Sequence, residues 1–200
     1  LLATSPGTSA MRRHAPRLLA SLVATGLLAS CASTVPADTA REPAPAISEA
    51  REAIANLAPA SGSLVSGSLR LLPMGGGVHV TGEIGGLTPG GTHAFHIHET
   101  GDCSAADASS AGGHFNPRNR AHGRAGQGAH HAGDADNLMA DARGVARVDR
   151  HFAFVALGGG GATDVVGRAV VVHAGVDDYL SQPAGNAGAR VACGVIRATR

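Results

Sequence analysis

The chain has 200 residues, which is enough for one domain with extra segments or at most two small domains. Its formal net charge is +1, so nothing in the charge indicates a general nucleic-acid binder. It contains 29 Gly and few aromatic residues, with no Trp, one Tyr and four Phe. Aliphatic side chains therefore have to fill the core, and many tight turns are expected. Eleven His is a high number for such a chain and indicates metal binding.

The N-terminal segment has the features of an export signal. Residues 1–10 precede Met11, and we interpret them as translation upstream of the start. Residues 11–30 combine three Arg with a short apolar run that is too short to span a bilayer. The run ends in Leu-Ala-Ser-Cys, which resembles a bacterial lipobox and predicts lipidation of Cys31. The alternative is an ordinary secretory signal that is cleaved near the same place.

Residues 31–50 follow the signal and are rich in Ala, Pro, Ser and Thr, without an apolar period. This composition predicts a flexible tether. A lipidated chain of this kind would be anchored to a membrane and face the outside of the cytoplasm, in the periplasm or at the cell surface.

The remaining residues, 51–200, predict a single β-rich domain. Short segments of alternating polar and apolar residues are separated by Gly- and Pro-containing turns, and none has a convincing helical period. The predicted strands are 53–58, 64–72, 78–84, a segment around 95–98, 145–155, 169–173 and 190–196. Several short strands of this kind are typical of an all-β sandwich or barrel.

The segment THAFHIHETGDC, residues 92–103, contains the most informative alternation. In a strand, side chains two residues apart share a face, so His96 and His98 are expected on one face and Phe95 and Ile97 on the other. We expect the apolar pair to enter the core and the imidazoles to project from the outer surface. Two imidazoles about 7 Å apart along a strand can bind one metal ion. The alternative is a half-buried strand with exposed histidines.

Residues 99–141 form a long Gly-, Asp- and His-rich segment without a clear period, which predicts a functional loop. It presents His114, His122, His131 and Asp134, and three imidazoles with one carboxylate suit tetrahedral zinc. Copper prefers a histidine-rich, roughly square arrangement. His96, His98 and a third imidazole could provide it, with His173 as the candidate at the end of a Val-rich strand.

Five segments in order strongly resemble the copper,zinc superoxide dismutases: THAFHIHETGDC, GGHFNP, HGRAGQGAHHAGD, GRAVVVHAGVDD and GNAGARVACGVI. The resemblance covers about 51–196, and it implies a Greek-key, immunoglobulin-like β-sandwich or barrel with long metal-binding and active-site loops. It implies one copper and one zinc ion per subunit. It also implies dismutation of superoxide, a small anionic substrate, to dioxygen and hydrogen peroxide, as extracytoplasmic antioxidant defence. Relatives include dimers and monomers, so a homodimer is one assembly compatible with the resemblance.

The resemblance also assigns site residues. It implies copper on His96, His98, His114 and His173, and zinc on His114, His122, His131 and Asp134, with His114 bridging the metals as an imidazolate. Asp177 matches a carboxylate that links a copper ligand to a zinc ligand. Cys103 and Cys193 match an intrasubunit disulfide. Arg190 matches an arginine beside the open copper position, whereas a surface arginine at a strand end is the alternative.

Other histidines have simpler interpretations. His130 neighbours His131 and is the alternative zinc ligand, although the family spacing selects His131. His93 is expected to be structural, and His79 and His151 are expected on strand surfaces.

The segment between Asp178 and Gly185 is short and has no Lys, unlike the longer loop of animal relatives. Our hypothesis is that Arg118, Arg120 and Arg124 take over part of the guidance of the anion. The main rival function is a non-catalytic copper-binding or copper-delivery lipoprotein on the same fold. A second rival is a structural or adhesive surface lipoprotein, which would not need these ligands.

Overall fold

The computed structural model describes residues 48–199. The expected signal segment, the lipidation of Cys31 and most of the tether lie outside these residues. The strands are β1 (Ala53–Pro59), β2 (Ser66–Met74), β3 (Gly77–Gly85), β4 (Thr92–His93), β5 (Phe95–His98), β6 (Leu138–Met139), β7 (Ala146–Ala153), β8 (Ala169–His173) and β9 (Arg190–Ala198). One 3₁₀-helix, η1 (Ser109–Ala111), interrupts the long loop. Among the described residues, no helix has the length and apolar character needed to cross a membrane.

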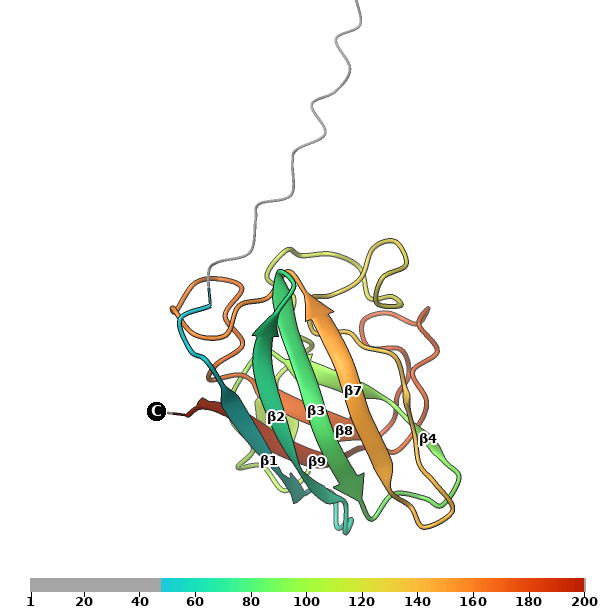
Figure 1. The fold of residues 1–200 in the computed structure, drawn as a ribbon. Coiled ribbons are helices and arrows are strands. Elements are labelled where there is room, and N and C mark those ends of the chain that lie inside the picture. The colour runs from blue at the N-terminus through green and yellow to red at the C-terminus, as the bar shows by residue number, and fades with distance from the viewer. Residues whose placement is uncertain (1–47, 200) are drawn as a thin grey trace, which may run out of the picture. The chain divides into compact units, whose positions relative to one another are not determined.

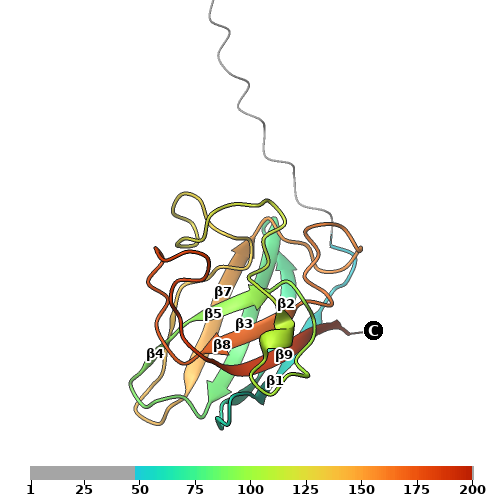
Figure 2. The same ribbon diagram turned by 180° about the vertical axis from the view of Figure 1, so that it is seen from behind.

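The strands confirm the predicted all-β class. Seven of them form one curled sheet in the order β5-β8-β9-β1-β2-β3-β7, and every pairing in it is antiparallel. Its two halves face each other: β1, β2, β3 and β7 lie in front in Figure 1, and β5, β8 and β9 lie in front in Figure 2. The two-residue strands β4 and β6 pair separately. The sequence did not predict β4 as a separate strand or β6 at all, because two residues are too short to show an alternation.

The core lies between the two halves of the sheet and follows the predicted alternation. Val78 and Val80 of β3 are fully buried, whereas His79 between them is only half-buried. Phe95 of β5 meets Phe152 of β7 across the core, with ring centroids 6.2 Å apart. Such aromatic pairs contribute about 0.5–1.5 kcal/mol beyond the area that they bury. Phe95 and Ile97 therefore enter the core, as predicted.

The outer face of β5, β8 and β9 is covered, and here one expectation is wrong. His96 and His98 are 0% and 1% exposed instead of projecting from the surface. The loop after β5 folds back over this face, and η1 lies over β8 and β9 in Figure 2. Small residues of this loop and of the strands beneath it form a second apolar cluster with the disulfide: Ala60, Ala108, Ala111, Ala169, Val171, Cys103 and Cys193. The histidines are thus enclosed between a strand face and a loop.

The expected disulfide between Cys103 and Cys193 is present and joins residues 90 positions apart. It connects the loop that follows β5 to the middle of β9. The same loop supplies Gly112, which lies beside the histidine cluster described next. The disulfide therefore fixes one wall of that cluster to the sheet.

Candidate metal centre

Three imidazoles come from strands. His96 and His98 stand on the outer face of β5, and His173 ends β8, the neighbouring strand. The β5–β8 register pairs His96 with Val171 and His98 with Ala169, and a register shift at Val172/His173 follows. Main-chain pairing therefore brings the backbones of all three histidines close together.

The other ligand candidates come from the loop between β5 and β6. Two parts of this loop pack against β5 through backbone hydrogen bonds: Phe115 N–H donates to the Ile97 carbonyl, and Ile97 N–H donates to the Gly133 carbonyl. A Cβ on Gly133 would lie 2.1 Å from the Ile97 oxygen, so only glycine fits there. His114 and Asp134 adjoin these contacts, which bring the loop to the strand histidines.

The first cluster consists of His96, His98, His114 and His173, whose nearest ring nitrogens lie within 4.8 Å of one another. His98 Nδ1 lies 3.0 Å from the Gly112 carbonyl, and His173 Nδ1 lies 3.3 Å from the Gly188 carbonyl. Because a carbonyl only accepts, each Nδ1 is the protonated nitrogen. The two Nε2 atoms, 3.4 Å apart, then face each other with lone pairs. A cation between them satisfies both.

The second cluster consists of His114, His122, His131 and Asp134, again with ligand atoms within 4.8 Å of one another. The Asp134 carboxylate is its centre, at 2.7 Å from His114 Nδ1, 3.0 Å from His122 Nδ1 and 3.3 Å from His131 Nδ1. It also accepts the backbone N–H of His131 at 2.8 Å. Three imidazoles and one carboxylate form a closed set of the kind that zinc prefers.

Buried nitrogens without hydrogen bonds mark both clusters. They are His96 Nδ1, His114 Nε2, His122 Nδ1 and His131 Nδ1. His122 Nδ1 is within ion-pair distance of Asp134 but lacks hydrogen-bond geometry. A buried polar atom without a partner costs about 1–3 kcal/mol unless something else binds it. His114 belongs to both clusters, with Nδ1 directed to one and a free Nε2 available to the other. The donor sets therefore fit two metal ions.

Asp177 joins the two clusters from outside. Its Oδ2 lies 2.8 Å from His96 Nε2, and its Oδ1 lies 2.9 Å from His122 Nε2. Each imidazole therefore donates its outer N–H to this carboxylate and keeps Nδ1 for the metal. Such acceptors fix the tautomer and the ring orientation of a ligand. The structure thus brings Asp177 to the position that the family resemblance implied.

The titration behaviour of the clusters differs. Burial lowers the pKa of His98 to about 2 and that of His173 to about 3, so these two imidazoles stay neutral. Burial also opposes the charged form of His122, but the carboxylates of Asp134 and Asp177 outweigh it and raise its pKa to about 9. Burial works against the charge on Asp134 as well, yet the surrounding imidazoles hold its pKa well below the usual range.

Arg190 stands at the entrance to the first cluster. Its guanidinium donates to the carbonyls of Ala108 and Gly112 at 2.7 Å each, which holds it half-buried at the start of β9. It lines an open cavity of about 390 Å³ together with His173 and the segment 181–188. A small anion that enters this cavity meets a fixed positive charge beside a ligand of the first cluster.

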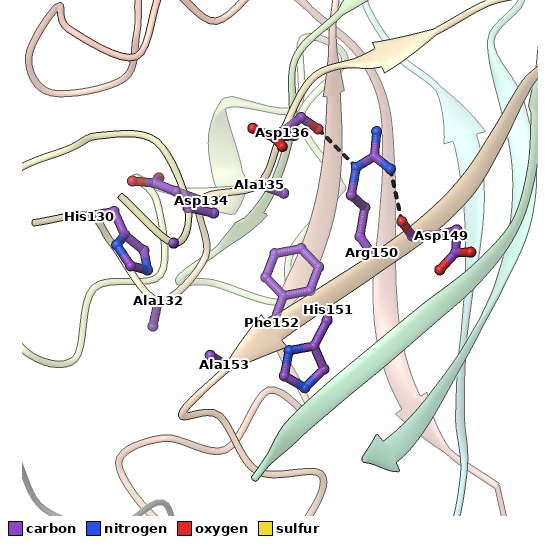
Figure 3. Close-up of a pocket in the computed structure, with 12 residues that line it drawn as sticks. His130, Ala132, Asp134, Ala135, Asp136, Asp149, Arg150, His151, Phe152 and Ala153 are labelled. Carbon is purple, nitrogen blue, oxygen red and sulfur yellow. Dashed lines mark hydrogen bonds between the residues drawn. The ribbon is translucent and has the colours of Figure 1, made fainter. Parts of the chain in front are cut away.

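The remaining predicted residues lie elsewhere. His93 is buried and donates to the His173 carbonyl, so it is structural, as predicted, and His79 pairs with Asp149 across the sheet surface. His130 does not join either cluster. Figure 3 shows it at the wall of a separate cavity, with His151 and Arg150 of β7 on the opposite side.

The three loop arginines also lie outside the Arg190 cavity. Arg124 binds Asp136 at 2.8 Å, and its guanidinium is 5.3 Å from the Tyr179 ring. Arg118 and Arg120 line a different cavity with Phe154. The residues that line the Arg190 cavity do not include any of these three arginines.

Sequence reasoning missed two residues that support the ligands. Asn137 pairs its amide with the backbone of Asp177, donating to the carbonyl at 3.0 Å and accepting the N–H at 2.9 Å. Gln182 makes the same kind of pairing with His122, at 2.8 and 2.9 Å. A lone amide in an aperiodic loop carries no signal in a single sequence, so neither role was readable.

Comparison with known proteins is consistent with this geometry. The family model described as copper/zinc superoxide dismutase matches residues 65–196. "Superoxide dismutase [Cu-Zn] 2" of Aquifex aeolicus is 44% identical over 136 residues, which are 66% of this chain and 80% of that protein. "Superoxide dismutase [Cu-Zn] 3" of Arabidopsis thaliana is 46% identical over 130 residues, 60% of this chain and 75% of that one.

A solved structure of a SOD-like protein from Bacillus subtilis has a similar fold. It is 36% identical, with a TM-score of 0.65 over 71% of this chain and 96% of that chain. The family model covers more than half of this chain, and the chain belongs to the copper/zinc superoxide dismutase family.

Proposed function

We propose that this protein converts two superoxide anions and two protons to one dioxygen and one hydrogen peroxide, using one copper and one zinc ion per subunit. The observation that carries the proposal is the pair of buried ligand sets that share one imidazole. The family match and relatives such as the Aquifex aeolicus superoxide dismutase support the reaction.

His96, His98, His114 and His173 are the proposed copper ligands. This set has imidazoles only, which suits copper better than a carboxylate-containing set does. It also lies beside the Arg190 cavity, where a small anion can approach. His114, His122, His131 and Asp134 are the proposed zinc ligands, because they form the closed set with a carboxylate.

When bound, copper supplies the one-electron chemistry that oxidises one superoxide and reduces the next, whereas zinc has no redox chemistry. The chain contributes the anion site, the proton and the ligand geometry. Arg190 attracts and orients superoxide at the cavity. His114 is the proposed bridging imidazolate, since its Nδ1 faces Asp134 and its Nε2 has no hydrogen-bond partner. We propose that Nε2 takes up a proton in one half of the cycle and donates it toward peroxide in the other.

We also propose that the protein is a membrane-anchored lipoprotein that acts outside the cytoplasm. The lipobox-like segment ending in Cys31 supports this location. The Cys103–Cys193 disulfide supports it as well, because such bonds persist in oxidising compartments. Labelling of cells with a radioactive fatty acid tests the anchor: the wild-type chain should become labelled, and a Cys31→Ala chain should not. Label on both chains, or on neither, contradicts the proposal.

The proposed reaction is tested by superoxide decay in the presence of the full chain loaded with both metals. We expect decay to accelerate in proportion to protein concentration, and we expect the copper-free, zinc-loaded chain to be inactive. Stoichiometric copper binding without turnover would instead identify the rival, a copper-binding module on this fold. The retention of Arg190 and of four imidazoles in the first cluster favours the enzyme.

A further inference from the structure

Residues 181–184 form part of one wall of the Arg190 cavity, and they belong to the segment 178–185, which is closed by its own hydrogen bonds. Asp178 N–H donates to the Gly185 carbonyl at 2.9 Å, and Gly185 N–H donates to the Ser181 carbonyl at 2.7 Å. The Asp178 carboxylate accepts Ser181 N–H at 2.8 Å and Ser181 Oγ–H at 2.6 Å. These internal bonds make the segment a small closed loop, and a constraint on one of its residues therefore acts on the whole loop.

At its tip, the Gln182 amide pairs with the backbone of His122, 60 residues earlier in the chain. His122 N–H donates to Gln182 Oε1 at 2.8 Å, and Gln182 Nε2 donates to the His122 carbonyl at 2.9 Å. The backbone N–H and the carbonyl of His122 are thus both bound by a single side chain. Two hydrogen bonds of this kind, as between paired residues of adjacent strands, fix the orientation of the His122 backbone as well as its position.

The same loop approaches His122 at its other end. A Cβ on Gly185 would lie 1.9 Å from Asp177 Oδ1 and 2.8 Å from His122 Nε2. Only a glycine backbone with its positive φ of +67° fits so close to this imidazole–carboxylate pair. His122 is therefore held by the wall loop on its main-chain side and on its Nε2 side.

We propose that Gln182 is a positioning residue that couples the second ligand cluster to the wall of the anion cavity. The proposal rests on the proposed function, in which His122 binds zinc. When zinc fixes the His122 side chain, the Gln182 pairing transmits this constraint to the loop 178–185. The coupling is reciprocal, so an ordered wall also retains zinc more strongly.

The coupling has a chemical consequence for the anion cavity. Ser181, Gln182 and Asn186 supply neutral polar groups to the wall, and Arg190 is the charged residue that lines it. The attraction between Arg190 and an anion depends on the distance between them, and the wall limits where in the cavity the anion can lie. A zinc ion bound to His122 would therefore act on the position of the anion through the Gln182 pairing.

The test compares Gln182→Met with Ser181→Ala in the full chain loaded with copper and zinc. Methionine keeps the length of the side chain and removes both bonds to His122, together with a 3.3 Å bond from Gln182 to the Leu180 carbonyl inside the loop. Ser181→Ala likewise removes a bond inside the loop but none to His122. Changes of residues that hold a ligand typically weaken metal binding by about 10–100-fold. Because Gln182 is exposed, we expect zinc release to a chromophoric chelator to be about three to ten times faster in Gln182→Met. Ser181→Ala should match the parent.

A second variant and a second measurement separate positioning from general loss of structure. Gln182→Glu keeps an acceptor for His122 N–H but cannot donate to the carbonyl, and it too should release zinc faster. With cobalt(II) in place of zinc, both Gln182 variants should shift the visible absorption bands of cobalt, and Ser181→Ala should not. Equal release rates for Gln182→Met and the parent, or equal acceleration in Ser181→Ala, overturn the inference. Failure of His131→Ala to reduce zinc binding would instead overturn the proposed function.

Discussion

His96, His98 and His173 are held by the ladders of neighbouring strands, whereas His122, His131 and Asp134 are held by a loop whose side chains converge on two carboxylates. The strand set keeps its spacing because main-chain bonds fix it. The loop set depends on Asp134, Asp177 and the amides of Asn137 and Gln182. The sheet therefore sets the spacing of the strand ligands, whereas side-chain contacts set the spacing of the loop ligands.

The two sets also differ in charge. Two of the strand imidazoles, His98 and His173, are neutral because burial lowers their pKa to about 2 and about 3. The loop set contains the Asp134 carboxylate and a His122 whose pKa, despite burial, is raised to about 9 by Asp134 and Asp177. Protons therefore compete with metal at the loop set more than at the strand set near neutral pH.

The largest expected effect separates the sets directly. His98→Ala removes a strand ligand and should abolish copper binding and lower dismutation by more than about 100-fold, since changes outside the ligand shell already cost about 10–100-fold. His131→Ala should lose zinc but keep copper. Metal content by atomic emission, with superoxide decay, measures both. Equal loss of both metals from either variant would show that the strand set cannot hold copper without the loop set.

A smaller effect is expected at the entrance. Arg190→Ala should slow dismutation about tenfold at low ionic strength and flatten its salt dependence, because charge guidance of this kind changes rates by about 10–1,000-fold. Arg190→Lys is the matched control: it keeps the charge and loses the planar contacts to Ala108 and Gly112. It should keep most of the salt dependence. An unchanged salt dependence in Arg190→Ala would exclude guidance by this residue.

Loss of the Asn137 side chain, which binds the backbone of Asp177, should have a similar or slightly smaller effect. This effect should appear in the affinity for metal ions. Asn137→Ala deletes both bonds to the Asp177 backbone, so we expect the affinity for each metal to fall about tenfold. Met139→Ala, two residues later, is the control because the Met139 side chain is 76% exposed. Competition with chelators of known affinity measures both variants. Equal affinities in the two would mean that Asp177 does not need this support.

The smallest effect concerns the loop arginines. Simultaneous change of Arg118, Arg120 and Arg124 to Gln should slow the reaction by only about twofold at low salt, because these residues do not line the Arg190 cavity and charge interactions weaken with distance. Arg124 is also neutralised by Asp136. No change in the salt dependence would refute the hypothesis that these residues help to guide the anion. If the triple variant slowed dismutation as much as Arg190→Ala does, Arg190 would not be the main residue that guides the anion.

Local alternation made the fold class and the inward face of β5 predictable. Phe95 and Ile97 are both buried in the core, as the alternation predicts. The Val-rich strand that ends in His173 is buried as well. The second strand was predicted at 64–72 but spans Ser66–Met74, since its polar ends carry no sharp boundary.

Contacts between distant loops were not predictable from one sequence. The burial of His96 and His98 depends on a loop that folds back over β5, and the roles of Asn137 and Gln182 depend on backbone groups 40 and 60 residues away. The family resemblance supplied Asp177 and the ligand assignment, whereas alternation and composition alone left His130 and His131 as alternatives. Geometry separates them, because only His131 joins the Asp134 cluster.

The central claim is that one imidazole, His114, serves both ligand sets. The most direct measurement is the electron paramagnetic resonance spectrum of the full chain with copper(II) in the first site and cobalt(II) in the second. If His114 bridges the ions, magnetic coupling through the imidazolate should suppress the copper signal, and replacement of cobalt by diamagnetic zinc should restore it. A copper signal of full intensity beside cobalt would show that the two ions do not share His114.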